Sequence, residues 1–309
     1  MPELPEVETV RRGLEALVLG SRIDGVTILR DSCVRLLPGG PAEMAAELTG
    51  LRVSRLARRG KFMWAEVAPR AGDDAPLLAL SAHLGMSGQF RVHEDAPAPH
   101  RHCRARLTLT DPDRTLDFLD QRTFGYLHVE PLVATADGGA GGRGTPLPLL
   151  PASVAHIGRD VLDPELDDAA ALRALRRGRR GIKQVLLDQT VVSGIGNIYA
   201  DEALWHARVH PERPAEAVSA AQARSVLAAS RAVMERALAQ GGTSFDALYV
   251  NVNGESGYFA RSLEAYGRAG EPCSRCGAPL QRAVVGGRST HWCAGCQRRP
   301  YARRHGPRS

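Results

Sequence analysis

Four cysteines close to the C-terminus constrain the fold of this chain more than any other feature of its sequence. Two residues separate Cys273 from Cys276, two separate Cys293 from Cys296, and sixteen lie between the pairs. This spacing is typical of a zinc ribbon, in which four thiolates hold one structural Zn²⁺ ion. Two disulfides are the alternative, but a reducing compartment disfavours them and a two-residue gap suits a thiolate knuckle better. We predict a zinc-finger β-hairpin over residues 267–304.

The first 130 residues combine one helical pattern with a series of short strand patterns. In the opening PELPEVETVRRGLEAL, apolar residues recur at three- and four-residue steps, and Pro5 suits an early helical position. From about Ile23 to Val129 the sequence indicates short strands separated by turns that contain Pro, Gly and Asp. The clearest strand patterns are Phe62–Val67, Leu77–Ser81, Arg104–Leu109 and Thr115–Leu119. We predict a β-sandwich domain with flanking helices over residues 1–130.

After this region the sequence changes from strand patterns to helical ones. Residues 131–151 read PLVATADGGAGGRGTPLPLLP, and their Gly, Pro and Ala content predicts a loop or interdomain linker. Residues 152–266 have apolar residues at helical spacing and are predicted to form a helical domain. The expected helices are Pro164–Arg177, Lys183–Gln189, Ile198–Arg208 and Ala215–Ala239. We therefore expect an α+β multidomain protein, in which residues 305–309 form a tail.

A glycine-containing turn interrupts the helical part, in the sequence VVSGIGNIYADE. Gly194 and Gly196 permit a tight turn, and Asn197 stands just before the next predicted helix. The backbone amides at such a helix start form an anion site, so one hypothesis is that a DNA phosphate binds there. A plain helical hairpin turn is the alternative, and the turn sequence by itself leaves both open.

Positive charge is concentrated in two parts of the chain. Residues 261–309 contain ten arginines and two glutamates, whereas the whole chain carries a formal net charge of +6. Lys and Arg side chains that neutralise phosphates release condensed counterions, so a nucleic-acid partner is one interpretation. Charge alone favours the other interpretation, a solvated surface. The second basic run consists of Arg173, Arg176, Arg177, Arg179, Arg180 and Lys183.

The N-terminus and the apolar content bear on where the protein acts. No apolar run is long enough to span a bilayer. The opening MPELPEVETV carries acids where a signal peptide would carry basic and apolar residues. We therefore expect an intracellular protein without a membrane anchor.

The second residue offers an unusual nucleophile. The initiator Met is expected to be removed before a small residue, which leaves Pro2 with a free secondary amine. An α-amino group has a pKa near 7.7–8.0 against about 10.4 for lysine, so far more of it is neutral at pH 7. A neutral amine attacks electrophilic carbon and forms a Schiff base, and Glu3 beside it is a candidate general acid or base. Many chains begin with Pro-Glu, and a simple helix start is the alternative.

Six sequence blocks together resemble the formamidopyrimidine-DNA glycosylase family. They occur in the family's order and span nearly the whole chain. The blocks are PELPEVETV at the N-terminus, RRGKF at 58–62, HLGMSG at 83–88, DQRTFG at 120–125, SGIGNIYADE at 193–202, and the four-cysteine finger. The resemblance implies a DNA-repair enzyme that excises oxidised purines, such as 8-oxoguanine and formamidopyrimidines, from damaged double-stranded DNA and cleaves the strand by β,δ-elimination. It also implies a helix-two-turn-helix DNA-binding domain, one structural Zn²⁺ ion, a monomer, and a cytoplasmic, nucleoid-associated location.

The same resemblance implies catalytic roles, residue by residue. Pro2 attacks C1′ of the damaged nucleoside, Glu3 supplies acid and base steps, and Glu6 helps to orient the lesion. Lys61 contacts phosphate and assists β-elimination, and Arg288 assists δ-elimination. A solvated lysine and a solvated arginine are the alternatives for the last two, and the surrounding sequences RRGKF and GGRSTHWC disfavour them.

A further set of residues is implied in DNA binding. A base inside a duplex is reached only when its nucleotide is extruded, and the resulting gap must be filled. Met86, Arg122 and Phe124 match the family's void-filling residues, with Arg122 expected to hydrogen-bond the orphaned cytosine; core positions for the two apolar residues are the alternative. Residues 249–268 resemble the region that contains the lesion-capping loop. Phosphate contacts are expected for His83, His100, Arg179, Lys183, Asn197, Tyr266 and Arg288.

Two other functions compete with this interpretation. An endonuclease VIII-like enzyme would prefer oxidised pyrimidines, but such relatives typically begin PEGPE and lack the R-x-F block at 122–124. A non-catalytic zinc-ribbon protein that binds damaged DNA is the other alternative. Binding alone needs no N-terminal amine, so the presence of Pro2, Glu3 and Lys61 disfavours it.

Overall fold

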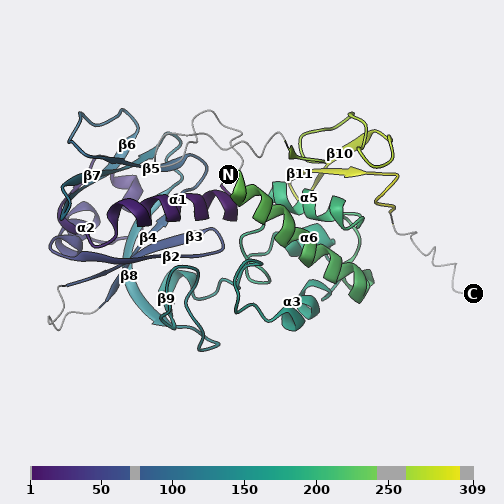
Figure 1. Ribbon diagram of the computed structural model, residues 1–309, viewed down its shortest axis with the longest axis horizontal. Helices are drawn as coiled ribbons and strands as arrows, with labels where there is room; N and C mark the ends of the chain where they lie inside the picture. The colour runs from purple at the N-terminus through teal and green to yellow at the C-terminus, as the bar shows by residue number, and fades with distance from the viewer. Residues whose placement is uncertain (1, 70–76, 242–261, 300–309) are drawn as a thin grey trace, which may run out of the picture.

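The structure is a computed structural model that describes residues 2–69, 77–241 and 262–299. A strand-rich unit from the first part of the chain lies beside a helical unit, on which a short β-hairpin packs (Figure 1). Each of the two larger units has its own buried apolar core. The class is α+β, as the sequence predicts.

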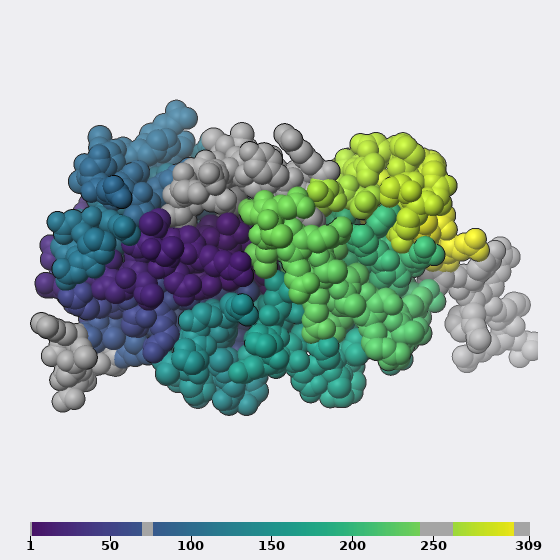
Figure 2. Space-filling view, viewed as in Figure 1, coloured from purple at the N-terminus to yellow at the C-terminus, as the bar shows by residue number. Residues whose placement is uncertain are grey.

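The first helix, α1 (Leu4–Val18), contributes to both cores. Val7, Val10 and Leu14 follow helical spacing and are buried against the strands. Leu4 lies at the beginning of the helix and is fully buried in the core of the helical unit. Figure 2 shows α1 running across the surface between the strand-rich unit and α6 (Ala220–Ala239). The N-terminus is therefore held where the two units meet.

Nine strands form one hydrogen-bonded sheet, in the order β5-β7-β6-β1-β2-β3-β4-β8-β9. Phe90 of β5 and Leu116 of β7 share a buried cluster with Leu80 of β4 and Leu127 of β8. The two halves of the sheet therefore pack face to face as the layers of a sandwich. The four strand patterns correspond to β3, β4, β6 and β7, with ends that differ by one or two residues. The strands are β1 (Arg22–Ile28), β2 (Arg52–Arg59), β3 (Phe62–Ala68), β4 (Leu78–His83), β5 (Gly88–His93), β6 (Cys103–Thr110), β7 (Arg114–Asp120), β8 (Tyr126–Ala134) and β9 (Leu149–Pro151).

Two short helices follow β1 and close one end of the sandwich. They are η1 (Asp31–Val34), a 3-10 helix, and α2 (Gly40–Leu48). Met44 and Leu48 of α2 are fully buried in the sandwich core, as expected for an amphipathic helix with a four-residue repeat.

Residues 135–148 of the segment 131–151 form neither helix nor strand, as its composition predicts, but both ends of the segment belong to the sheet. Its first residues continue β8, and its last three form β9, which pairs with β8. Between them, the backbone of Arg143 exchanges two hydrogen bonds of 2.9 Å with the backbone of Arg58. A Cβ atom at Gly142 would lie 2.3 Å from the Arg58 carbonyl oxygen, so the glycine is required for close backbone contact. Gly142 therefore allows the backbone of this segment to pack directly on β2.

The helical unit contains shorter helices than the apolar patterns predict. They are α3 (Asp168–Leu175), α4 (Ile182–Leu186), α5 (Asn197–His206) and α6. Helix α6 begins after Ser219, whose hydroxyl accepts a hydrogen bond from the Gln222 amide, so residues 215–217 form a separate 3-10 turn (η3). Asp167 caps α3 in the same way, so the helix begins at Asp168 and not at the predicted Pro164.

The C-terminal hairpin consists of β10 (Leu280–Val285) and β11 (Arg288–Cys293), which pair antiparallel from Leu280↔Cys293 to Val285↔Arg288. This is the hairpin that the cysteine spacing predicts. Residues 300–309, which include the predicted tail, and most of the region that resembles a lesion-capping loop lie outside the described residues. Within the described ranges, no helix is both long and apolar enough to cross a membrane.

Candidate active site and nucleic-acid interface

The carboxylate of Glu3 occupies the N-terminus of α5. It accepts hydrogen bonds from the backbone amides of Gly196 at 2.7 Å, Ile198 at 2.9 Å and Tyr199 at 3.4 Å. The sequence correctly indicates an anion site at this glycine turn, but a carboxylate of the same protein occupies these three amides, so they are not free to bind a phosphate. A Cβ atom at residue 196 would lie 2.2 Å from the Glu3 carboxyl carbon. Glycine is therefore required there.

Glu3 is only 2% exposed, and this burial has the largest effect on the pKa of its carboxyl group. Burial and the nearby Glu6 carboxylate raise the pKa of Glu3 to about 7, against the lowering effect of Lys61 and the amides of Ile198 and Tyr199. A carboxyl group with such a pKa is present in both protonation states near neutral pH. It is therefore suited to donate a proton in one step and to accept one in another.

Glu6 and Tyr199 hold the peptide next to Pro2. One Glu6 oxygen accepts a 2.8 Å hydrogen bond from the Glu3 backbone amide, and the other accepts a 2.8 Å bond from the Tyr199 hydroxyl. Pro2 itself is buried. Tyr199 is a functional residue that sequence reasoning missed, although it lies within the quoted block SGIGNIYADE. The bonds hold the backbone of Glu3, the residue that directly follows Pro2.

Lys61 lies in the turn between β2 and β3 and is 9% exposed. Burial lowers the pKa of Lys61, as does Arg288, while Glu3 and Glu6 raise it. The turn packs on the loop before α5, because a Cβ atom at Gly60 would lie 2.5 Å from the Ser193 hydroxyl. The structure thus brings Glu3, Lys61 and Arg288 into one electrostatically coupled cluster, although they come from three distant parts of the sequence.

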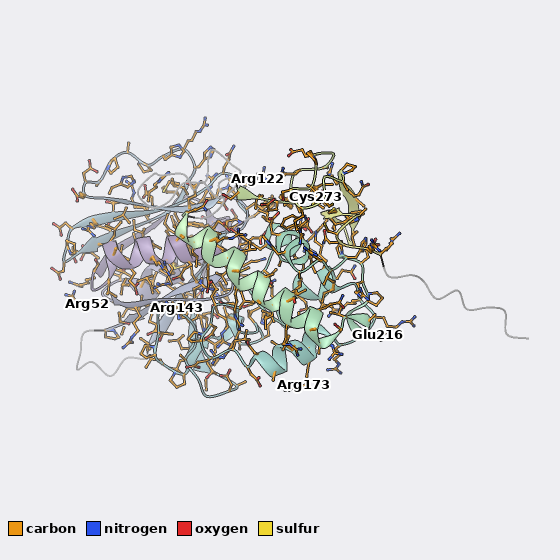
Figure 3. All side chains as sticks on the ribbon, turned by 45° about the vertical axis from the view of Figure 1, so that its right-hand side comes forward. Arg52, Arg122, Arg143, Arg173, Glu216 and Cys273 are labelled. Carbon is orange, nitrogen blue, oxygen red and sulfur yellow. The ribbon has the colours of Figure 1, made fainter. Side chains whose placement is uncertain are left out.

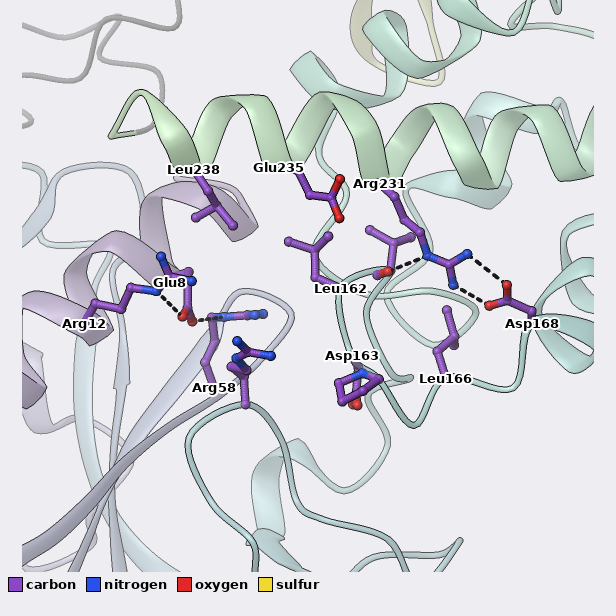
Figure 4. A pocket seen from close by; sticks show the side chains of 13 residues that line it. Glu8, Arg12, Arg58, Leu162, Asp163, Leu166, Asp168, Arg231, Glu235 and Leu238 are labelled. Carbon is purple, nitrogen blue, oxygen red and sulfur yellow. Dashed lines mark hydrogen bonds and ion pairs between the residues drawn. The ribbon is translucent and has the colours of Figure 1, made fainter.

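A buried ion network stabilises the turn that carries Lys61. Arg58 donates to Glu8 at 2.9 Å and to Asp160 at 2.8 Å, and all three side chains are about 2% exposed. Asp160 also accepts a 3.0 Å bond from the Gly60 amide, so the network holds the backbone next to Lys61. Burial alone would raise the pKa of Glu8, but the guanidinium groups of Arg11 and Arg58 lower it to about 2. Figure 4 shows Arg58 and Arg12 on either side of Glu8, at the edge of a pocket of about 500 Å³ between α1 and α6.

Removal of the Asp160 carboxylate is expected to destabilise the protein strongly. The Asp160→Ala variant leaves Arg58 buried with half of its charge compensation, which costs about 3–5 kcal/mol of unfolding free energy for a buried pair. Asp168→Ala is the matched control, because Asp168 also pairs with an arginine, Arg231, but its side chain is 49% exposed. The control should lose no more than about 1 kcal/mol. Urea denaturation of both variants measures the difference, and equal losses would contradict the role assigned to the buried network.

The three residues predicted to fill the void in DNA lie together on two adjacent turns. Met86 is 41% exposed and Phe124 is 55% exposed, which excludes the alternative that both are core residues. Arg122 is also exposed, and its Nη1 lies 3.7 Å from the Met86 sulfur. We call Met86, Arg122 and Phe124 the wedge. Figure 3 shows Arg122 along the same edge of the molecule as Cys273 of the hairpin unit, with Arg173 and Glu216 toward the opposite edge.

The two histidines predicted to contact phosphate lie on the strand-rich unit. His83 contacts the rings of Phe62 and Tyr126, and its Nδ1 accepts a 3.1 Å hydrogen bond from the Gly85 amide. Burial lowers the pKa of His83, as do the charges of Lys61 and Arg35, so the ring is neutral and its proton is on Nε2. The Nε2 donor has no partner among the described residues, and such a donor suits a phosphate oxygen. His100 is exposed in the loop before β6.

Lys183 does not make the predicted phosphate contact. It is 1% exposed, and its ammonium group binds Asp201 at 2.6 Å, the Thr290 hydroxyl at 2.9 Å and the Ser289 carbonyl at 3.0 Å. All three donors of the ammonium group are therefore used. Lys183 connects α4, α5 and β11, and so it anchors the hairpin on the helical unit.

The remaining predicted residues lie around this hairpin and on the basic turn after α3. Asn197 donates to the Ser289 carbonyl at 2.9 Å, and its buried Oδ1 has no hydrogen-bond partner in the described part of the chain. Tyr266 packs its ring against His291 at 4.9 Å. Arg288 is exposed at the start of β11. The Arg179 side chain is 91% exposed and lies 3.8 Å from Glu216.

The four cysteines of the hairpin unit fit a zinc ion. Their sulfur atoms all lie within 4.8 Å of one another, and none forms a disulfide. A tetrahedral Zn²⁺ ion with Zn–S bonds of about 2.3 Å requires sulfurs at such distances from one another. A Cβ atom at Gly295 would lie 3.2 Å from the Cys276 sulfur, so the knuckle has little room for a side chain there. Cys273, Cys276, Cys293 and Cys296 hold one structural Zn²⁺ ion.

Three family models match this chain in order. They are the formamidopyrimidine-DNA glycosylase N-terminal domain at residues 1–127, the formamidopyrimidine-DNA glycosylase H2TH domain at 157–247, and the zinc finger found in FPG and IleRS at 270–299. Together the three matches cover most of the chain and correspond to the strand-rich unit, the helical unit and the hairpin.

Whole-chain comparisons give the same family. A protein named formamidopyrimidine-DNA glycosylase from Nocardioides sp. is 52% identical, over 98% of this chain and 97% of its own. A protein of the same name from Thermobifida fusca is also 52% identical, over 97% of this chain and 98% of its own. The Lactococcus lactis Fpg in complex with DNA containing an abasic site has a TM-score of 0.78 at 30% identity, covering 96% of this chain and all of the other. The MutM (Fpg) protein of Thermus thermophilus has a TM-score of 0.76 at 36% identity, covering 96% of this chain and 98% of the other. This chain belongs to the formamidopyrimidine-DNA glycosylase family.

Proposed function

We propose that this protein is a bifunctional DNA glycosylase and AP lyase that removes oxidised purines from duplex DNA in base excision repair. The single observation that carries this proposal is the buried cluster of Pro2, Glu3, Glu6 and Lys61, in which an N-terminal imino acid lies beside a carboxyl group whose pKa is about 7. The relatives support the substrate class, because one solved Lactococcus lactis complex contains Fapy-dG DNA and a solved MutM complex contains carbocyclic 8-oxo-G DNA.

The first chemical step is assigned to Pro2 and Glu3. The electron pair of the free Pro2 amine forms a bond to C1′ of the extruded nucleotide while the bond from C1′ to the damaged base breaks. The base leaves with the electrons of that bond and takes up the proton that the Pro2 nitrogen releases. Protonated Glu3 then gives its proton to O4′, the C1′–O4′ bond breaks, and the electron pair of the nitrogen forms the iminium. The Glu3 carboxylate formed in this way is stabilised by three backbone amides at the N-terminus of α5.

Strand cleavage follows from the iminium. Loss of a C2′ proton expels the 3′ phosphate by β-elimination, and a second elimination expels the 5′ phosphate. Lys61 is assigned to the first elimination, because burial lowers the pKa of its ammonium group and so favours the neutral amine, and Arg288 is assigned to the second. The iminium acts as the electron sink in both steps, so no external oxidant or reductant is needed.

We assign the DNA contacts to residues of both larger units and of the hairpin. The wedge enters the stack, and His83, His100, Asn197, Tyr266, Arg179 and Arg288 are assigned to the phosphate backbone, without Lys183. The proposed functional division is a catalytic domain over residues 1–130, a helix-two-turn-helix DNA-binding domain over 152–266 and a zinc finger over 267–304. The proposed place of action is the nucleoid in the cytoplasm.

Borohydride trapping tests the proposal. Protein from which Met1 has been removed is expected to form a covalent adduct with a duplex that contains 8-oxoguanine opposite cytosine, and mass spectrometry should locate the reduced deoxyribose on Pro2. An undamaged duplex and protein that retains Met1 are the controls, and neither should be trapped. An adduct on a lysine side chain, or no adduct with fully processed protein, would contradict the assigned nucleophile.

A further inference from the structure

We propose that Arg35 is a positioning residue that holds the wedge in the shape that enters DNA; this inference rests on the proposed function. Arg35 follows η1 and reaches across to the turn that carries Phe124. Its Nη2 donates to the Phe124 carbonyl at 3.0 Å, and its Nη1 donates to the Gly125 carbonyl at 2.8 Å. Nη1 also donates to the Ser32 carbonyl at 2.9 Å, so the guanidinium group is itself fixed by its own segment.

The same guanidinium group supports the second turn of the wedge through two aromatic rings. The Arg35 Cζ atom lies 5.0 Å from the centre of the Tyr126 ring, a distance at which a cation and a π face attract each other. The Tyr126 ring stacks on His83 with centroids 5.3 Å apart and an angle of 7° between the planes. His83 in turn accepts the Gly85 amide, one residue before Met86. Arg35 therefore contacts the Phe124 turn directly and the Met86 turn through Tyr126 and His83.

Contacts between the turns make them a single body. A Cβ atom at Gly85 would lie 2.6 Å from the Gly125 nitrogen, so the two backbones are in direct contact. The buried Asp120 carboxylate accepts bonds from the Ser87 hydroxyl at 2.5 Å and the Gly125 amide at 2.7 Å. A displacement of the Phe124 turn is thus transmitted to the Met86 turn.

The backbone conformation of the wedge explains why an external clamp is needed. Thr123, between Arg122 and Phe124, has a φ of 57°, in the left-handed region that a β-branched residue avoids. Such a conformation persists only where its surroundings fix it. The carbonyls that Arg35 binds belong to the two residues that follow Thr123, so the guanidinium group acts where the turn would otherwise relax.

The alternative role for an exposed arginine beside DNA is direct contact with a phosphate. The two roles differ in what the side chain must provide. A phosphate contact needs a positive charge, which lysine also supplies, whereas the two carbonyls require the planar fork of a guanidinium group. Arg35→Lys therefore separates the two roles, and Arg35→Ala removes both.

The experiment compares Arg35→Ala, Arg35→Lys and the control Arg30→Ala, which removes another exposed arginine from the same segment. Single-turnover rates are measured on two duplexes, one with 8-oxoguanine opposite cytosine and one with an abasic site, in which no base has to be extruded. Both Arg35 variants are expected to slow base excision about tenfold, the effect of losing one strong hydrogen-bonding group, while cleavage at the abasic site stays near the wild-type rate. Fluorescence of 2-aminopurine next to the lesion should rise more slowly in the same two variants.

Each other outcome overturns the inference. Recovery of base excision by Arg35→Lys would show that the charge alone matters. Equal losses on the two duplexes would show a general loss of structure, and unchanged excision in Arg35→Ala would remove any role for this residue. Failure of the wild-type protein to excise 8-oxoguanine would contradict the proposed function instead, which keeps the two failures distinct.

Discussion

Replacement of Glu3 by glutamine is expected to slow base excision by about 10²- to 10⁴-fold, the contribution typical of a positioned general acid or base. Glutamine keeps an oxygen that can accept from the amides of α5, so the fold around the site is retained, but its side chain holds no transferable proton. The loss therefore falls on the chemical step, and affinity for the damaged duplex should change little. Single-turnover rates and equilibrium binding, measured separately, distinguish the two effects.

The pH dependence provides an independent check on Glu3. Its pKa is raised to about 7, so the protonated fraction decreases as the pH rises through 7, and a step that uses the proton slows above that pH. The neutral fraction of the N-terminal amine increases over the same range, with a pKa near 8. The wild-type profile should therefore be bell-shaped, and Glu3→Gln should lose the falling limb and keep the rising one.

Glu47→Gln is the matched control for these measurements, because Glu47 is an exposed acid on α2, within the same unit but outside the site. It should retain both the rate and the shape of the wild-type profile. A Glu3→Gln variant that kept the falling limb near pH 7 would show that another group supplies the proton.

The position of the Glu3 carboxylate at the N-terminus of α5 shows what a local sequence pattern does not predict. The turn before α5 was predicted to bind an anion from local chemistry alone, because glycines and free amides at a helix start have that property in any protein. The identity of the anion depends on a contact between residues 193 positions apart, Glu3 and Gly196. Such a contact is a property of the tertiary fold, and no local pattern encodes it.

Features with a short-range physical cause were predictable. The cysteine spacing predicts the hairpin, and short strand patterns between Pro, Gly and Asp turns predict four of the strands. Lys183 was misassigned for the opposite reason: it belongs to a basic run, yet it is buried against Asp201, a partner whose position the run does not reveal. Burial separates Lys183 from exposed Arg179 in the same run. A run of basic residues shows how many cations a segment contains, but not which of them face solvent.

The glycine-rich segment 131–151 gives a related lesson. Glycine is enriched both in flexible linkers and where two backbones must approach closely, and composition does not distinguish the two cases. Gly142 belongs to the second case, since the Arg58 carbonyl occupies the space of its missing side chain. Asp160 and Arg35 carried no sequence signal, because each acts on a partner more than eighty residues away.

Replacement of Cys293 by serine is expected to release the zinc ion and to abolish tight binding of damaged DNA. A structural zinc site supplies on the order of 10 kcal/mol of folding free energy in isolated zinc fingers, so the loss of one thiolate ligand removes most of what holds the hairpin together. Cys293 is fully buried at the end of β11, where it pairs with Leu280. The effect should therefore extend along the whole strand to Arg288.

Loss of the hairpin is expected to affect the active site through the hydrogen bonds that join β11 to the helical unit. Ser289 of β11 accepts hydrogen bonds from both Lys183 and Asn197, and the His291 amide donates to Asp201 at 2.8 Å. When β11 detaches, Lys183 and Asp201 keep each other but lose the partners on β11 that complete their hydrogen bonding.

Zinc content is measured by atomic absorption, and DNA affinity by titration of a labelled duplex. Cys103→Ser is the matched control, since Cys103 is buried at the start of β6 and lies outside the four-sulfur cluster. The control should keep one zinc ion per chain and bind DNA normally, whereas a Cys293→Ser protein that retained both properties would show that the hairpin is held by its contacts with α5 and not by the metal.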